Sequence, residues 1–198
     1  MLKIFATIIT KFFRRKKYVL TNLTINHEGR RLRRIKAKKD IPGYGVKTGD
    51  LGGFIQSYRN LSQFGDCWVG EDGKVYDHAK VCDDAIVRYK AGVFDHAKVC
   101  GRAVVYGYAL VYGDSRVADD SEVYGDSLIF EFAHVGGKSH IHGYAELSGN
   151  CKVINSAIHG DTTILGSAKV NNSDIFGNST ICSKQTVNNE KLKDVVIR

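Results

Sequence analysis

Aliphatic residues recur at every sixth position along most of this chain. The series runs through Val69, Val75, Val81, Val87, Val93, Val99, Val105, Val111, Val117, Val123, Ile129, Val135, Ile141, Leu147 and Val153. A small residue stands four positions after most of these, as at Ala79, Ala97 and Ser115. A period of six matches neither an α-helix nor a simple strand, so it indicates a short strand followed by a tight turn, repeated many times.

Three such units close a triangular coil of about 18 residues, and stacked coils place parallel strands about 4.8 Å apart. In each strand the small and the aliphatic residue point inward and the residue between them points outward, while Gly, Asp or Asn turns the corner. The rhythm loses one residue after Val153 and again after Val170. We therefore expect an all-β parallel β-helix with seven coils, preceded by a degenerate eighth coil whose aliphatic positions are Leu51, Ser57 and Gln63.

The hexad pattern resembles that of the hexapeptide-repeat proteins, and the resemblance covers about residues 51–190. The segment G-D-L-G-G-F-I-Q-S-Y-R-N-L-S (Gly49 to Ser62) and the repeated V-Y-G-D are similar to a narrower group of bacterial and phage repeat proteins. Members of that group are described as transferases or left uncharacterised. The resemblance implies a left-handed helix, although the general rule for parallel crossovers predicts a right-handed one. It also implies self-association, with a trimer favoured and a dimer as the alternative.

Three regions are expected along the chain. Residues 1–50 form a basic cap, with a short amphipathic helix near the start and a β-hairpin whose strands are Tyr18 to Ile25 and Arg31 to Ala37. Residues 51–190 form the β-helix, and residues 191–198 form a tail or a closing strand. No apolar stretch is long enough for a transmembrane helix, but a weak membrane-surface contact through residues 1–17 stays open.

The positive charge lies almost wholly in the first quarter of the chain. Residues 1–50 hold 14 Lys and Arg against three acids, whereas residues 51–198 hold 15 against 18. The candidate anion-binding residues of this region are Arg14, Arg15, Lys16, Lys17, Arg30, Arg31, Arg33, Arg34, Lys36, Lys38 and Lys39. Seven of them crowd into the segment from Arg30 to Lys39, where alternating side chains make both faces of a strand basic. Such a patch predicts contact with nucleic acid or an acidic protein surface, and a solubilising cap strand is the alternative.

The coil register predicts a second basic feature, a column of outward-pointing residues. Its members are Lys80, Lys98, Arg116, His134, Lys152 and Lys169. Like charges about 5 Å apart repel one another. Either corner acids or an anionic partner would offset this repulsion, and a solvated face is the alternative reading.

Apolar residues also line up between coils. Trp68, Ile86 and Val104 occupy successive outward positions on another face and need a cover, which is either a second subunit or the N-terminal segment. We expect an oligomer interface there. At one corner Tyr76, Phe94, Tyr112 and Phe130 are expected to stack as a stabilising ladder.

The residues able to carry chemistry give weaker signals. His78 stacks on His96 and Asp77 on Asp95, so these corners are either solvated or hold a divalent metal. His142 and His159 share a corner, whereas His134 and His140 lie on different faces, which argues against a three-histidine zinc site. The five cysteines form no C-x-x-C pair, and no signal peptide is evident, so a cytoplasmic protein with reduced thiols is expected. We expect no catalytic residue, no metal and no cofactor.

The leading hypothesis is a non-catalytic binding or scaffold protein. Its basic N-terminal region would contact nucleic acid or a nucleic-acid-handling protein, and the phage resemblance implies a role in host interaction or anti-defence. One alternative is a trimeric transferase of acyl groups or nucleotide sugars, as the hexapeptide resemblance implies. The other is a structural component of a particle.

Overall fold

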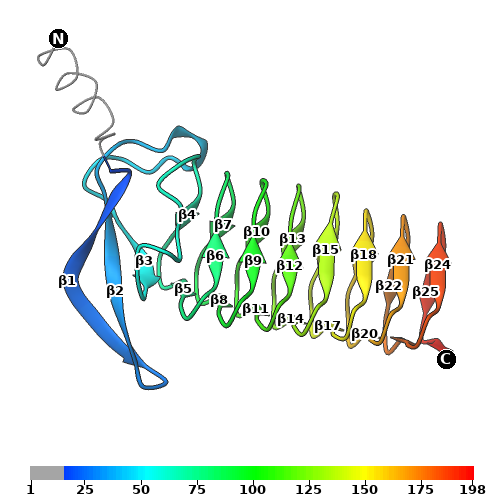
Figure 1. The fold of residues 1–198 in the computed structure, drawn as a ribbon. Coiled ribbons are helices and arrows are strands. Elements are labelled where there is room, and N and C mark those ends of the chain that lie inside the picture. Colours follow the sequence, from blue (N-terminus) through cyan, green and yellow to red (C-terminus); the bar gives the residue numbers. More distant parts are fainter. Residues whose placement is uncertain (1–15) are drawn as a thin grey trace, which may run out of the picture.

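A computed structural model describes residues 16–198 as a parallel β-solenoid of about eight turns, with an antiparallel hairpin at its N-terminal end (Figure 1). Three parallel sheets form the sides of the triangular coil and run the length of the solenoid. The predicted fold class is confirmed. The predicted helix near the start of the chain lies outside the described residues.

We name the three sheets by their strand counts, which differ because the hairpin strands join one sheet and the first coil gives another only an isolated bridge. The eleven-stranded sheet contains β1 (Tyr18–His27), β2 (Arg30–Ala37), β3 (Leu51–Ile55), β5 (Lys74–Val75), β8 (Gly92–Val93), β11 (Leu110–Val111), β14 (Leu128–Ile129), β17 (Glu146–Leu147), β20 (Thr163–Ile164), β23 (Thr180–Ile181) and β26 (Val196–Ile197). The eight-stranded sheet contains β4 (Trp68–Val69), β7 (Ile86–Val87), β10 (Val104–Val105), β13 (Glu122–Val123), β16 (His140–Ile141), β19 (Ala157–Ile158), β22 (Asp174–Phe176) and β25 (Lys191–Lys193). The seven-stranded sheet contains β6 (Lys80–Val81), β9 (Lys98–Val99), β12 (Arg116–Val117), β15 (His134–Gly136), β18 (Lys152–Ile154), β21 (Lys169–Asn171) and β24 (Thr186–Asn188).

The hexad accounts for the core and for the corners. Aliphatic residues such as Val99 and Ile129, and small residues such as Ala97, are fully buried in one column down the axis. Two positions after each aliphatic residue the backbone is left-handed, with φ of +55° at Asp95 and +70° at Gly101. A Cβ added at Gly101 would lie 2.7 Å from the backbone nitrogen of Asp119 in the next coil, so this corner has no room for a side chain unless the backbone shifts.

The predicted loss of one residue per coil is confirmed. His134 pairs with Lys152, 18 residues later, whereas Lys152 pairs with Lys169 and Lys169 with Thr186, each 17 residues later. The strands of the seven-stranded sheet lengthen to three residues at this point, as in β18 and β21. The side chains therefore stay in their columns although the coil is shorter.

The first coil differs from its prediction. Ile55 pairs with Val75 and Leu61 bridges to Val81, so these two residues occupy the aliphatic positions, and both are fully buried. Leu51 is 48% exposed instead. The expected register was wrong because the paired residues Ile55 and Val75 are 20 positions apart in the sequence. Val69 and Val87 further along are paired at the regular separation of 18. The extra residues lie in the irregular loop before Trp68.

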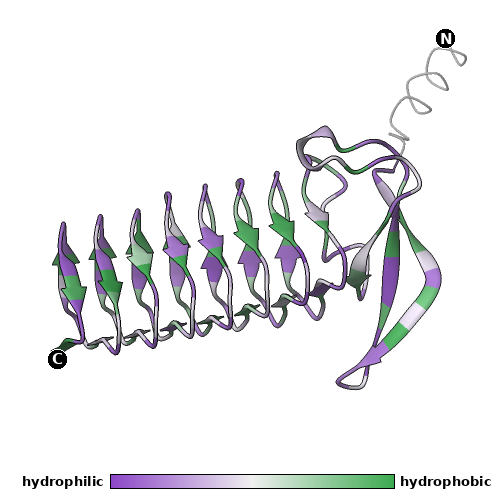
Figure 2. Cartoon of the chain, turned by 180° about the vertical axis from the view of Figure 1, so that it is seen from behind, coloured by the Kyte–Doolittle hydropathy of each residue, from purple (hydrophilic) through white to green (hydrophobic). Residues whose placement is uncertain are grey.

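The N-terminal hairpin extends the solenoid sheet. Strand β2 pairs antiparallel with both β1 and β3, and β3 pairs parallel with β5, so one sheet passes from cap to coils. The register of β2 and β3 shifts around Gly52 and Gly53, where chain segments approach closely. A Cβ added at Gly52 would lie 2.5 Å from the carbonyl oxygen of Val69 and 2.6 Å from the indole of Trp68. Figure 2 shows polar and apolar segments alternating along both hairpin strands.

At the other end, residues 191–198 complete the last coil. Strand β25 pairs with β22, and β26 pairs with β23, both in parallel. Of the two predicted alternatives, the closing strand agrees with the structure. Leu192 and Ile197 are partly buried and pack against the end of the core.

Candidate anion-binding surface

The predicted basic column lies along the seven-stranded sheet. Its six members, Lys80, Lys98, Arg116, His134, Lys152 and Lys169, pair in register from strand to strand. All are exposed except His134, which is half-buried. After Lys169 the next position is Thr186. Before Lys80 it is Asn60, a buried neutral residue, because Leu61 bridges to Val81. The column therefore begins at Lys80 and ends at Lys169.

No acid among residues 16–198 forms an ion pair with the Lys and Arg side chains of the column. None of its five Lys and Arg side chains forms a hydrogen bond or an ion pair within that part of the chain. The corner acids accept backbone N–H groups from the following coil instead. Asp83 accepts from Gly101 at 3.1 Å, Asp95 from Gly113 at 3.1 Å and Asp119 from Gly137 at 2.8 Å. These carboxylates keep their charge beside the column, but none forms an ion pair with its cations within the described residues, so the cations remain available to a partner.

The electrostatics of the column are visible at its histidine. The pKa of His134 is lowered, first by burial of the ring and then by the positive charges of Lys152 and Arg116. Asp119 acts in the opposite direction but is the weakest of these influences. Burial and the neighbouring cations therefore both favour the neutral form of the imidazole.

Several basic residues of the hairpin already have partners within the chain. The Arg30 Nε donates to Asp77 Oδ1 at 2.6 Å, and its guanidinium lies 5.2 Å from the centre of the Tyr76 ring. Arg33 donates to two carbonyl oxygens of β1, at Leu20 and Thr21. Arg34 donates to the carbonyl oxygens of Gly52 and Glu71 and lies over Phe54. These three arginines tie the hairpin together and to the first coils.

The prediction that Lys17 binds an external anion is wrong. Its side chain is fully buried, and Nζ donates to the carbonyl oxygens of Cys67 at 2.7 Å and Gly65 at 3.2 Å. Nζ also lies 3.0 Å from Cys67 Sγ. Burial raises the pKa of the Cys67 thiol, and the Lys17 charge acts in the opposite direction. Lys17 thus anchors the loop before Trp68 to the base of the hairpin.

The remaining N-terminal candidates are either exposed or lie outside the described residues. Arg31, Lys36, Lys38 and Lys39 are exposed, and Lys16 is exposed with its Nζ 4.8 Å from the centre of the Tyr58 ring. Arg14 and Arg15 lie outside the described residues. The expectation of two basic faces on the second strand is only partly met, because Leu32, Ile35 and Ala37 are buried and three of the arginines have internal partners.

The proposed oligomer interface is largely covered within the chain itself. Trp68 and Ile86 are 4% and 6% exposed, and Val104 is half-buried. Trp68 packs against Gly52 and meets the Tyr18 ring edge-on at 6.5 Å between centres. The loop after β2 reaches the same face, where Tyr44 donates a hydrogen bond to the carbonyl oxygen of Asp84. The N-terminal region is therefore the cover for Trp68 and Ile86, which corrects their assignment to an oligomer interface. Self-association stays a prediction.

The aromatic ladder is confirmed, with ring centres 5.1, 4.9 and 5.0 Å apart from Tyr76 through Phe94 and Tyr112 to Phe130. A second ladder was missed by the sequence reasoning, apart from its histidine pair. It runs through Tyr106, Tyr124, His142, His159 and Phe176, with spacings from 4.7 to 5.2 Å. The signal was present, because each member directly follows an aliphatic residue of the eight-stranded sheet.

The histidine corners show stacking. The rings of His78 and His96 are 4.8 Å apart, and those of His142 and His159 are also 4.8 Å apart. His159 Nε2 lies 3.1 Å from Asp174 Oδ1. Within residues 16–198, no three His, Cys, Asp or Glu side chains gather in a group that could hold a metal ion.

No protein-family model matches this chain, and no curated protein sequence is significantly similar to it. In the part of the chain that the structure describes, no helix is both long enough and apolar enough to cross a membrane.

Proposed function

We propose that this protein binds single-stranded nucleic acid, with the phosphate backbone lying along the basic column. The observation that carries the proposal is the in-register line of Lys80, Lys98, Arg116, Lys152 and Lys169, whose side chains form no ion pair within the described residues. A single line of cations suits one backbone, and positively charged tracks of this kind bind single strands. No acidic residue belongs to the column to repel the ligand.

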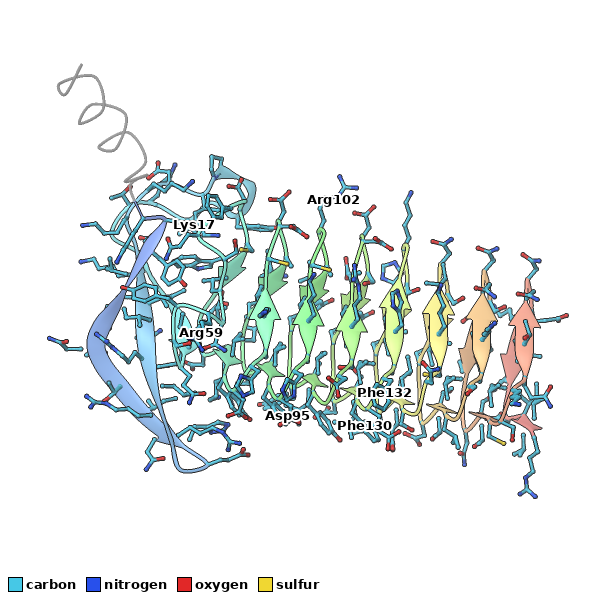
Figure 3. The ribbon with its side chains drawn as sticks, in the orientation of Figure 1. Lys17, Arg59, Asp95, Arg102, Phe130 and Phe132 are labelled. Carbon is cyan, nitrogen blue, oxygen red and sulfur yellow. The ribbon has the colours of Figure 1, made fainter. Side chains whose placement is uncertain are left out.

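An exposed aromatic ring beside the column supports the same class of ligand. Phe132 is 62% exposed and stands at the corner two residues before His134 (Figure 3). Single-strand binders combine cationic tracks with aromatic side chains on which bases stack, and each stack contributes about 1–3 kcal/mol. The exposed cations of the N-terminal region, such as Lys36 and Lys38, add a second basic surface.

We also propose that the solenoid is left-handed, as its resemblance to the hexapeptide-repeat proteins implies. We further propose that the protein is cytoplasmic and has a phage-related role in host interaction. The coil length and the triangular section support the fold resemblance.

The test is a salt titration of binding to a labelled single-stranded oligonucleotide. Affinity should fall with a log–log slope of about −0.7 per neutralised phosphate, hence about −3.5 for five cations. A triple variant, Lys98→Gln with Arg116→Gln and Lys152→Gln, should reduce the magnitude of the slope by about 2. Phe132→Ala should weaken binding and leave the slope unchanged, because the ring carries no charge.

The matched control removes three exposed lysines from corners, Lys90→Gln with Lys138→Gln and Lys184→Gln. Net charge falls by the same amount, but the column is intact, so the slope should stay close to that of the parent. Equal slopes for the two triple variants would reject the column as the binding surface. Absence of binding by the parent at low salt would reject the function.

A further inference from the structure

A hollow of about 450 Å³ lies at the N-terminal end of the basic column. It is lined by Arg59, Asp77, His78, Lys80, His96 and Lys98, and we call it the His78 hollow. Figure 3 shows Arg59 between the hairpin and the first coils of the column. Lys80 and Lys98 belong to the column, whereas the other lining residues come from the corner before it and from the loop after β3.

The hollow is strongly cationic. Its one acid, Asp77, forms an ion pair with Arg30, whose Nε donates to Oδ1 at 2.6 Å, while Oδ2 is buried without a hydrogen-bond partner. The side chains of Arg59, Lys80 and Lys98 form no hydrogen bond or ion pair within residues 16–198. Three cations without an ion-pair partner in the described chain therefore line a hollow whose single carboxylate is paired with Arg30.

The two histidines add hydrogen-bond donors. Their rings are exposed and stacked, and an imidazole carries at least one N–H in either protonation state. This pair exists at only two coils, because the register places Asp114 and then Phe132 at the same corner of the next two. The hollow is thus a local feature and not a property of every coil.

We propose that the His78 hollow binds a phosphomonoester dianion. A terminal phosphate carries close to two negative charges and three acceptor oxygens, which matches converging Arg, Lys and imidazole donors better than a carboxylate would. The volume exceeds what a phosphate needs and lies within the range of small-ligand pockets, so part of the attached nucleoside also fits. The phosphate can come from a mononucleotide or from the end of a nucleic-acid strand. In the second case the inference rests on the proposed function, and in the first it does not.

The first experiment compares AMP, adenosine and inorganic phosphate, with NMR signals of the His78 and His96 side chains as readout. AMP should shift these signals, inorganic phosphate should shift them at higher concentration, and adenosine should not. Arg59→Gln removes a cation that belongs to the hollow and not to the column, and it should weaken AMP binding about tenfold, as loss of a charge-assisted hydrogen bond does. Lys184→Gln, which removes an exposed cation outside both the hollow and the column, should leave AMP binding unchanged. Equal shifts with AMP and adenosine, or parental AMP affinity in Arg59→Gln, would overturn the proposal.

The second experiment identifies the source of the phosphate by comparing an oligonucleotide with a 5′-phosphate and the same oligonucleotide with a 5′-hydroxyl. A preference for the phosphorylated strand that Arg59→Gln abolishes assigns the hollow to strand ends. AMP binding without that preference assigns it to mononucleotides. If the column variants alter the salt slope but AMP does not bind, the hollow is rejected and the proposed function stands. If AMP binds and no oligonucleotide does, the proposed function is rejected and the hollow stands.

Discussion

The basic residues of the hairpin and those of the coils have opposite surroundings. In the hairpin, Arg30 faces a carboxylate and Arg34 faces carbonyl oxygens and an aromatic ring, because each neighbour comes from a different part of the chain. In the coils, Lys98 faces Lys80 on one side and Arg116 on the other, because the register stacks equivalent positions. A repeating chain therefore places residues of the same type beside one another in successive coils. Aromatic rings gain from this arrangement, whereas cations repel and remain free for an outside ligand.

The strongest test of the comparison is Lys17→Met. In the N-terminal region a basic residue is part of the packing, so its loss should destabilise the fold. We expect the free energy of unfolding to fall by about 3 kcal/mol, because the buried carbonyl oxygen of Cys67 and the partly buried one of Gly65 lose their donor. Urea unfolding followed by far-UV circular dichroism would measure it. The control is Lys16→Met, an exposed neighbour, for which a change beyond about 0.5 kcal/mol is not expected.

A second test concerns the junction between the two regions. Gly52→Ala should lower the free energy of unfolding by about 2 kcal/mol, because its Cβ would overlap the Val69 carbonyl and the Trp68 ring. Trp68 is the only tryptophan of the chain, so its fluorescence reports this contact directly. The matched control is Gly43→Ala, where the nearest atom to a new Cβ is a carboxylate oxygen at 3.7 Å. Equal stability of the two variants would mean that the cap is not seated on Trp68.

The third test contrasts one arginine and one lysine. Arg34→Gln should destabilise the protein by about 1 kcal/mol through the loss of hydrogen bonds to Gly52 and Glu71. Lys98→Gln should stabilise it by about 0.5 kcal/mol, because two like-charge cross-strand contacts disappear. The second effect should shrink as salt screens the column. Thermal melts at low and high salt would give both values, and two changes of the same sign would contradict the comparison.

The smallest expected effect is at His134. Because its pKa in the folded state is lowered, the unfolded chain binds the proton more readily. Its contribution to stability is therefore fully present above about pH 6.5 and is lost as the pH falls through the lowered pKa. Lys152→Gln should raise the pKa of His134, which an NMR titration of the imidazole would detect. Lys169→Gln, two strands away, serves as the distant control and should have a smaller effect.

The repeating part of this molecule could be predicted closely because a single rule generates it. The hexad places Lys80 opposite Lys98 and Tyr112 opposite Phe130 without any knowledge of the core beyond inward and outward alternation. The two coils of 17 residues were also predicted, because the spacing of the aliphatic residues shortens by one after Val153 and again after Val170. The column is the one part of the candidate site for which sequence reasoning supplied both the members and their order.

The N-terminal region could not be predicted in the same way. That Lys17 is buried depends on a loop some fifty residues later, and no local pattern announces that contact. The cover over Trp68 depends on a register shift at Gly52 and on Tyr44 reaching Asp84. The first coil was misaligned because Leu51 continues the spacing of six, although the irregular loop before Trp68 breaks it. Aperiodic contacts of this kind are set by tertiary packing and leave no period in the sequence.

The agreement between Val75–Cys82 and Val93–Cys100 has a consequence for how such a chain can change over generations. A tandem duplication or deletion of one whole coil would leave every remaining strand beside an equivalent partner. An insertion of any other length would turn side chains onto the wrong face unless a corner absorbed it. Each added coil would lengthen the molecule by about 4.8 Å and could carry one more cation. The length of the solenoid and the number of cations in the column would then increase together, one coil at a time, while the N-terminal region stayed unchanged.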